Sequence, residues 1–343
     1  MEIDIYKNIK TIEYIKTNNS EEKKIDLISW KKSIKYFQNK IFTNINNIYG
    51  DLNNNFLSEA VTDNFFEIYD KIKVLDDFQD YDYKYKAKIS YMNRLIINDK
   101  AKMDKYIEKQ FHLFLKTGEF VTCFNLDEIQ CQNKLNQILK IDYLNQYAHS
   151  IQPYIALSKN TTNLFVEMLL KTLQYEYIQI RRSKMYKYFD MEILNENINL
   201  YATPCCFEFD DEGTKNESLY FIKNGRLKQY LTNLFISYKF NQPTSGYVVH
   251  NKNNYQYNCS CFTLESNAVG ISNIKSFNYF DICRVLSFNI RNGDFKILVL
   301  QSYLYKEETI IQRYLPHIFA GNIFEILKKP IFAKDGELII NIE

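Results

Sequence analysis

The stretch from Thr203 to Leu231, TPCCFEFDDEGTKNESLYFIKNGRLKQYL, decides how the C-terminal half of this chain is interpreted. Apolar residues alternate from Cys205 to Phe209, just before the acidic turn Asp210-Asp211-Glu212-Gly213. A second apolar run, Leu219–Ile222, leads to Asn224-Gly225, a strong signal for a β-hairpin. The glycine in each turn can adopt the positive φ that such turns require. The stretch therefore predicts three strands joined by two tight turns.

The acidic turn has two interpretations. Three consecutive carboxylates could bind a divalent cation or perform acid–base chemistry. Alternatively, Asp side chains in a hairpin turn commonly accept hydrogen bonds from nearby backbone amides. The second interpretation is favoured unless another ligand reaches the turn from elsewhere in the chain.

Composition narrows the class of protein. A chain of 343 residues, 46% hydrophobic and 24% charged, is typical of a globular protein with two domains. The net charge of +2 gives no electrostatic basis for nucleic-acid binding. No apolar run is long enough to cross a membrane, and the N-terminal residues show no secretory signal. Seven cysteines without a regular framework indicate free thiols, so we expect a cytoplasmic protein.

Residues 1–152 are expected to form an N-terminal α+β domain. A short strand is predicted around Ile3–Ile9, and Ser20 could cap a helix with Glu21 and Glu22 in its first turn. The remaining predictions are a helix at Phe56–Val74, strands at Ala87–Ile97, Tyr106–Leu115 and Glu119–Asn125, and a helix from Asp127 toward Tyr147.

Residues 153–343 are expected to form a β-rich domain with a long helix at its start, which makes the fold class α+β. A strand at Tyr154–Leu157 precedes Asn160-Thr161-Thr162, which could cap an amphipathic helix. Asn292-Gly293 predicts a second hairpin, and Ala320-Gly321-Asn322 precedes an apolar helix, Ile323–Leu327. Further strands are predicted at 205–209, 218–223, 226–231, 259–265, 284–290 and 295–305.

Candidate metal ligands and nucleophiles are scattered. The four histidines lie far apart, in different predicted elements. Cys205-Cys206 and Cys259-x-Cys261 match the usual zinc spacings poorly, and buried reduced thiols in strands are the favoured interpretation. Cys283 follows Asp281 closely and could have a histidine near it in space, but a core thiol is favoured there too.

Three blocks, in order, resemble the TldD/PmbA peptidase family, once described as modulators of DNA gyrase. Phe209–Gly213 with Ile222–Leu231 is similar to the family pattern FDDEG…IENGxLKxYL, and Asn292–Phe295 to SGDFS. Phe319–Leu327 is similar to IAGNLxDML. The family-signature residues, for which a structural role is expected, are Asp210, Asp211, Glu212, Gly213, Asn224, Gly225, Gly293, Asp294, Gly321 and Asn322.

The resemblance implies one of two kinds of subunit. TldD-type chains carry HExxxH on the long helix and bind zinc, whereas PmbA-type chains, also called TldE, lack the motif and pair with a TldD. The corresponding helix here, Leu164–Ile178, contains no histidine. The resemblance therefore implies a non-catalytic subunit, with no catalytic or metal-binding residue of its own. Its TldD-type partner would carry the zinc, and the complex would trim or degrade unfolded or modified peptides.

Two alternatives come from other classes. The chain could be a stand-alone peptide-binding or scaffold protein that kept the fold without peptidase activity. It could also be an enzyme that uses Cys283 or the Cys205/Cys206 pair. Co-purification with an HExxxH-bearing chain would separate the first alternative from the subunit interpretation. Activity that survives EDTA but not thiol alkylation would identify the second.

Overall fold

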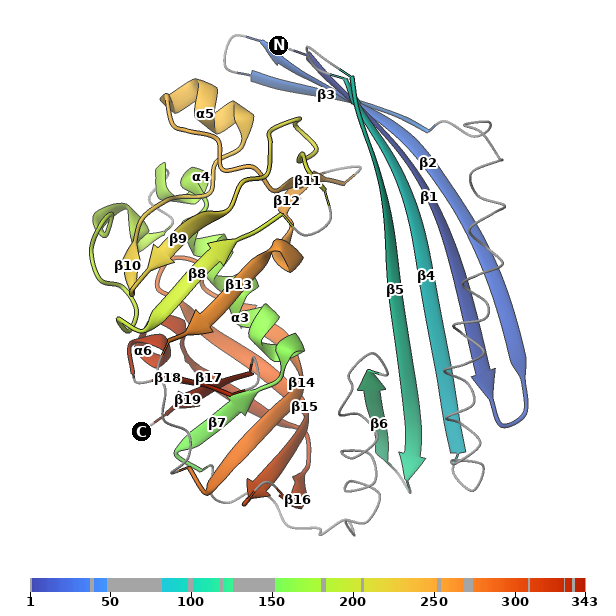
Figure 1. Cartoon of the computed structure of the whole chain (residues 1–343), viewed down its shortest axis with the longest axis vertical. Helices are drawn as coiled ribbons and strands as arrows, with labels where there is room; N and C mark the ends of the chain where they lie inside the picture. Colours follow the sequence, from blue (N-terminus) through green and yellow to red (C-terminus); the bar gives the residue numbers. More distant parts are fainter. Residues whose placement is uncertain are drawn as a thin grey trace. The chain divides into compact units, whose positions relative to one another are not determined.

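The computed structural model describes residues 2–37, 40–47, 82–97, 101–117, 120–125, 152–179, 183–204, 207–251, 254–267, 274–307, 309–329, 331–334 and 337–342. The chain divides into two compact units, Met1–Asn136 and Gln137–Glu343 (Figure 1). The fold is α+β and rich in strands, as predicted. The predicted boundary at Gln152-Pro153 stays a prediction.

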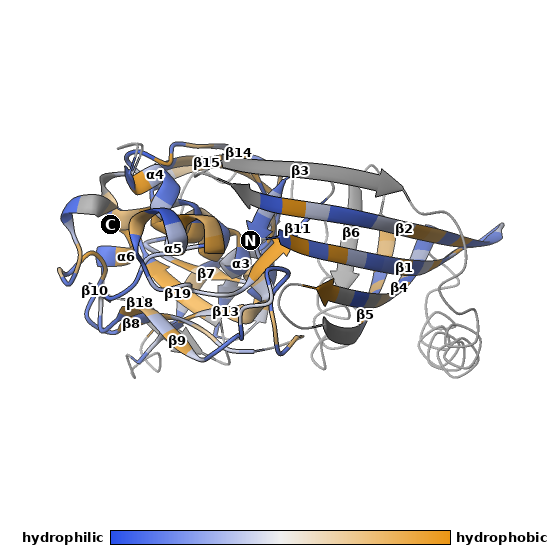
Figure 2. Cartoon of the chain, turned by 90° about the horizontal axis from the view of Figure 1, so that it is seen from above, coloured by the Kyte–Doolittle hydropathy of each residue, from blue (hydrophilic) through white to orange (hydrophobic). Residues whose placement is uncertain are grey.

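The described part of the first unit is one antiparallel sheet of long strands with the order β3-β2-β1-β4-β5-β6. Figure 1 shows β1, β2, β4 and β5 running side by side, and Figure 2 shows hydrophilic and hydrophobic residues alternating along these ribbons. The strands are β1 (Glu2–Thr17), β2 (Glu21–Phe37), β3 (Lys40–Asn47), β4 (Asp82–Ile97), β5 (Ala101–Thr117) and β6 (Phe120–Asn125).

The helix predicted from Ser20 is wrong, because Ser20 closes a hairpin. Its backbone N–H donates to Thr17 Oγ1 at 3.0 Å, and its carbonyl accepts from the Thr17 N–H at 2.8 Å. The chain then returns as β2, with Glu21 opposite Lys16. A polar serine between two alternating segments suits a turn as well as a helix cap.

The buried face of this sheet changes along its length. On β1, Ile3 and Ile5 are buried at one end, whereas Ile12 and Tyr14, which have the opposite parity, are buried at the other. Since neighbouring side chains of a strand point to opposite faces, each half of the sheet buries a different face. β4 shows the same change, from Tyr91 to Arg94.

The other predictions for this unit have mixed outcomes. The strands predicted at 87–97, 106–115 and 119–125 correspond to β4, β5 and β6. Ile3–Ile9 belongs to the much longer β1. The helices predicted at Phe56–Val74 and from Asp127 toward Tyr147 lie outside the described residues.

The second unit combines several sheets with short helices. One sheet has the order β16-β15-β14-β7-β19-β18, with β17 also pairing with β15, and another has the order β10-β9-β8-β13. The strands are β7 (Tyr154–Leu157), β8 (Ile198–Ala202), β9 (Leu219–Lys223), β10 (Arg226–Leu227), β11 (Val248–His250), β12 (Tyr255–Tyr257), β13 (Phe262–Ser266), β14 (Ser276–Phe288), β15 (Asp294–Lys306), β16 (Thr309–Tyr314), β17 (His317–Asn322), β18 (Ile331–Lys334) and β19 (Glu337–Asn341).

The predicted long helix is present as α3 (Lys159–Leu173), but it begins and ends elsewhere than predicted. Its N-cap is Ser158, whose Oγ accepts from the Thr161 N–H at 3.1 Å, not the Asn160–Thr162 group. The helix is interrupted at Gln174, which has extended φ and ψ and bridges to Leu231. A short α4 (Tyr175–Gln179) follows.

Helix α3 supplies the centre of the core of this unit. Its buried face, which includes Phe165, Leu169 and Leu173, lies against strands β14, β7, β19 and β13 (Figure 1). The Phe165 ring meets the Phe295 ring edge-on, with centroids 5.4 Å apart. Helix α3 thus packs against strands of both sheets, and this layered packing buries the apolar faces of the domain.

One predicted strand of this unit is wrong in the described residues, and another is correct only in part. Of the strand predicted at 205–209, residues 207–209 contribute only a single bridge, Phe209 to Lys215. Of the strand predicted at 259–265, Cys259–Cys261 forms a 3-10 turn (η3), whereas the residues from Phe262 on form β13 as predicted. The predicted strand at 226–231 is shortened to β10. The hairpin predicted at Asn292-Gly293 is confirmed, since it joins β14 to β15.

Candidate functional site

The acidic turn is buried, and its first carboxylate binds backbone amides. Asp210 Oδ1 accepts from the Glu212 N–H at 3.0 Å and the Thr214 N–H at 2.8 Å. Oδ2 accepts from the Val248 N–H at 3.3 Å. The isolated bridge between Phe209 and Lys215 closes the loop around it. This is the arrangement that the structural interpretation of the turn predicts.

The next two carboxylates tie the turn to other elements. Asp211 Oδ2 accepts from the His250 N–H at 2.5 Å. Glu212 Oε2 accepts from the N–H of Leu234, the first residue of α5 (Leu234–Phe240), at 2.6 Å. Glu212 Oε1 lies 3.2 Å from His250 Nε2. The turn therefore fixes both the β11–β12 hairpin and the start of α5.

Burial raises the pKa of several groups around this turn. The pKa of Asp210 is raised well above its usual range by burial and then by the Glu212 charge. Burial and then Glu212 also raise the pKa of Glu176, which accepts a hydrogen bond from the Tyr255 hydroxyl. Carboxyl groups with shifted pKa values can mark an active site, but these carboxylates accept their hydrogen bonds from the backbone and from Tyr255, which is consistent with a structural role.

The Asn224-Gly225 turn is pressed against a neighbouring loop. An added Cβ at Gly225 would lie 2.4 Å from the Leu194 carbonyl oxygen and 2.7 Å from that of Asn195. Gly225 also has φ +69°, and its carbonyl accepts from the N–H groups of Ile193 and Leu194. The position therefore requires glycine for both backbone conformation and close approach.

The second and third sequence blocks meet in space. Strand β15 pairs with β17 so that Asp294 lies opposite Asn322. Asn322 Nδ2 donates to Asp294 Oδ1 at 2.7 Å and to the Asn292 carbonyl at 2.8 Å. Asn322 also caps α6 (Ile323–Lys328), because its Oδ1 accepts from the Phe324 and Glu325 N–H groups. Gly293 packs closely against the Phe324 ring, because a Cβ added at Gly293 would lie 2.6 Å from Phe324 Cδ2.

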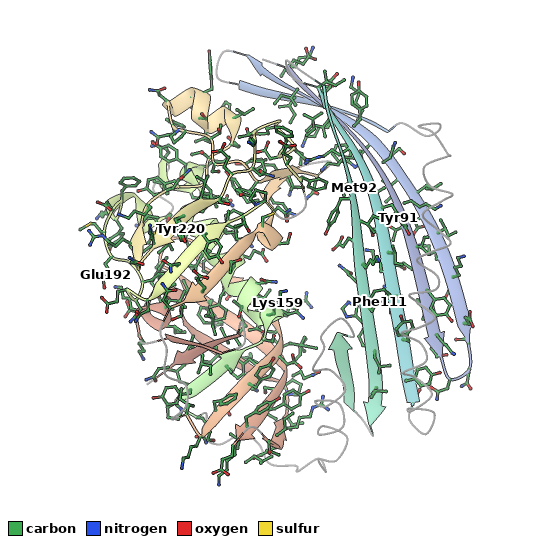
Figure 3. All side chains as sticks on the ribbon, in the orientation of Figure 1. Tyr91, Met92, Phe111, Lys159, Glu192 and Tyr220 are labelled. Atoms are coloured by element: carbon green, nitrogen blue, oxygen red, sulfur yellow. The ribbon has the colours of Figure 1, made fainter. Side chains whose placement is uncertain are left out.

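A cavity of about 310 Å³ lies beside this junction. It is lined by the two asparagines and Asp294, and by seven residues that the sequence analysis did not select: Met185, Tyr188, Glu192, Ile193, Phe324, Glu325 and Lys328. Glu192 is labelled in Figure 3. Phe324 and Glu325 lie inside the third block. The residues at 185–193 carry no local signal, because only the fold brings them to the junction.

The polar face of α3 carries an ion pair. Lys171 Nζ lies 2.7 Å from Glu167 Oε1, one helical turn away. Cys259 on η3 is close enough for both charges to act on its thiol. Burial, followed by Glu167, raises the pKa of that thiol to about 11. The group therefore consists of a carboxylate, an ammonium and a protonated thiol.

The described thiols and histidines do not form the centres considered from sequence, and the Cys205/Cys206 pair lies outside the described residues. Cys259 and Cys283 are free, but Cys261 is disulfide-bonded, so the expectation of free thiols is wrong for that residue. Burial raises the pKa of Cys283 to about 12. His250 contacts Glu212, whereas His317 packs against Phe280. The structure thus gives Cys283 no described histidine base within hydrogen-bonding distance.

The sequence profile of the PmbA/TldA metallopeptidase C-terminal domain matches residues 153–337. The chain therefore belongs to the PmbA/TldA family. A solved structure of TldE from Thermococcus kodakarensis has a similar fold, with a TM-score of 0.76 at 13% identity over 99% of this chain and 95% of that one. A proposed modulator of a DNA gyrase from Thermotoga maritima has a TM-score of 0.74 at 11% identity, again over 99% and 95%.

One curated relative is also similar in sequence. The uncharacterized protein MJ0231 of Methanocaldococcus jannaschii is 26% identical over 181 residues, which is 49% of this chain. The match spans only 42% of that relative's length. No described helix is long and apolar enough to cross a membrane.

The family name implies a metal, and the described residues of this chain do not fit one. Among the described residues, no three His, Cys, Asp or Glu side chains are arranged so that they could hold a metal ion. On α3 the one carboxylate that faces a thiol is already paired with Lys171. Zinc needs deprotonated thiolates, imidazoles or free carboxylates as ligands.

Proposed function

We propose that this chain is the non-catalytic, TldE/PmbA-like subunit of a heterodimeric zinc peptidase. The observation that carries the proposal is the polar face of α3, where Glu167 pairs with Lys171 and no histidine is present, on the helix that corresponds to the HExxxH-bearing helix of TldD-type chains. The similarity to TldE over 99% of the chain supports the proposal. A cytoplasmic TldD-type subunit would supply the zinc, and with it an activated water.

The substrate class follows from the same proposal. The complex would trim or degrade unfolded or modified peptides, and this chain would close the reaction chamber. Strands at the ends of its sheets, β10 and β13 in the smaller sheet, could pair with an extended peptide. A peptide methylated on alternate backbone nitrogens should then be captured more weakly than the same sequence unmethylated.

Metal content tests the proposal directly. The chain would be purified alone and after co-expression with an HExxxH-bearing family member, and zinc would be measured by mass spectrometry together with peptide hydrolysis. Zinc and hydrolysis are expected only in the co-purified complex. Stoichiometric zinc on this chain alone would contradict the proposal. A failure of the two chains to associate would favour the stand-alone peptide-binding or scaffold alternative.

A further inference from the structure

The cavity beside the Asp294–Asn322 junction combines an apolar floor with a charged rim. Three separate segments form it: residues 185–193, the β14–β15 turn, and α6 with its cap Asn322. Met185 and Ile193 are buried, and the rings of Tyr188 and Phe324 are half-buried. The volume of about 310 Å³ is at the lower end of the range for small-ligand sites, enough for one long side chain.

The charges at the rim are predominantly negative. Glu192, Asp294 and Glu325 contribute three carboxylates, and Lys328 contributes one ammonium. All four residues are exposed. The side chains of Glu192, Glu325 and Lys328 make no hydrogen bond or ion pair with a described residue.

Asp294 differs from the other carboxylates because it is held in place. Its Oδ2 accepts from Asn292 Nδ2 at 2.5 Å, and its Oδ1 accepts from Asn322 Nδ2 at 2.7 Å. Both donors are neutral amides, so they fix the orientation of the carboxylate without placing a positive charge beside it. A ligand group that meets Asp294 therefore finds a preorganised acceptor, which lowers the entropy cost of binding.

We propose that this cavity binds the basic side chain, lysine or arginine, of an extended peptide. The aliphatic stem of such a side chain would lie on Met185 and Ile193, and its cation would meet Asp294 and Glu192. The faces of Tyr188 and Phe324 also attract cations. A neutral side chain would gain only the apolar contacts, and an acidic one would be repelled. The inference rests on the proposed function, because it names the peptide feature that this subunit recognises.

Methyl NMR of the full chain with ¹³C-methyl-labelled methionine tests the inference at the cavity itself. Met185 lines the cavity, and Met168, buried in α3, is the internal control. The probes are Nα-acetyl-lysine methylamide, its norleucine analogue, which keeps the stem without the charge, and its glutamate analogue. Only the lysine probe is expected to shift the Met185 methyl signal saturably while that of Met168 stays in place.

Charge variants give the sign of the effect. Glu192→Gln and Glu325→Gln should each weaken lysine binding by about threefold, as expected for partly exposed charges. Lys328→Gln should strengthen binding, because it removes a repulsive charge. Glu217→Gln, an exposed carboxylate outside the cavity lining, is the matched control and should change nothing.

The outcomes separate this inference from the proposed function. A Met185 shift that is equal for lysine and norleucine, absent for both, or unaffected by the Glu192 and Lys328 variants would overturn the inference. Association with the zinc subunit would be measured on the same preparation. If the chain associates with the zinc subunit but the lysine probe does not shift the Met185 methyl signal, only the cavity inference fails. If it does not associate, the proposed function fails, whatever Met185 reports.

Discussion

Asp294 and Asn322 lie opposite each other across β15 and β17, joined by a 2.7 Å hydrogen bond from the amide nitrogen to the carboxylate. The same asparagine caps α6 with its amide oxygen. One side chain therefore links the hairpin turn of one sequence block to the helix start of another, and it positions the carboxylate that faces the cavity.

Replacing Asn322 with alanine should destabilise the fold. The change removes the cap of α6 and leaves the Asn292 carbonyl and the Asp294 carboxylate without their shared donor. We expect a loss of about 1–3 kcal/mol in the free energy of unfolding, measured by urea denaturation. Asn163→Ala, on the exposed face of α3, is the control and should change stability by less than about 0.5 kcal/mol. Equal effects of the two variants would contradict the role given to Asn322.

Alanine at three signature glycines should destabilise in a fixed order. Gly225→Ala should be worst, because its Cβ would meet backbone oxygen at 2.4 Å and its φ is +69°. Gly293 also has positive φ, but a Cβ added there would meet the Phe324 side chain and not the backbone, so Gly293→Ala should cost less than Gly225→Ala. Gly321 has no positive φ, and an added Cβ would be crowded by the flexible end of Ile326 at 2.9 Å but would make only ordinary contacts with Phe295. The first two should each cost about 1–3 kcal/mol in urea denaturation. A larger loss for Gly321 than for Gly225 would refute this order.

Local signals correctly predicted the β14–β15 turn and the start of α6 in the second unit. Asn292-Gly293 was predicted as a turn because the dipeptide favours positive φ, and Gly293 has φ +87°. The start of α6 after Asn322 follows from another local preference, that of asparagine for the N-cap position of a helix. In contrast, Ser158 was missed as the cap of α3, since two threonines and an asparagine downstream gave an equally good signal.

The first sheet was harder to predict because its buried face changes. A strand is recognised by apolar residues at every second position, but on β2 Trp30 and Ile34 are buried while Ile25 and Ile28 are exposed. That spacing resembles one face of a helix. The cavity lining was out of reach for another reason: Glu192 and Asp294 are brought together only by the fold.

The two free thiols among the described residues, Cys259 and Cys283, should react slowly with iodoacetamide in the native protein. Burial raises the pKa of Cys259 to about 11 and that of Cys283 to about 12. At pH 8 roughly one molecule in a thousand would carry a Cys259 thiolate, and fewer would carry a Cys283 thiolate. Peptide mass spectrometry after timed alkylation measures this, with urea-unfolded chain as the fast-reacting control. Cys261 should be labelled only after reduction. Rapid alkylation of Cys283 in the native protein would contradict this prediction and would favour the alternative that the chain is an enzyme with Cys283 as its nucleophile.

Glu176 should make the fold less stable as pH rises toward neutrality. Its folded pKa is raised above 4.5, first by burial and then by Glu212, so folding favours the protonated carboxyl. The stability contributed by this group is therefore fully present below pH 4.5 and is lost as pH rises through the raised folded pKa.

The substitution Glu176→Gln tests this. The glutamine side chain cannot ionise, but its amide oxygen can still accept the hydrogen bond from the Tyr255 hydroxyl. Urea denaturation should show the variant more stable than the parent at neutral pH and the difference shrinking below pH 4.5. Asp210 titrates in both proteins and cancels in the comparison, and Glu217→Gln controls for the lost charge. A variant that is less stable than the parent at neutral pH would mean that ionised Glu176 has a stabilising partner.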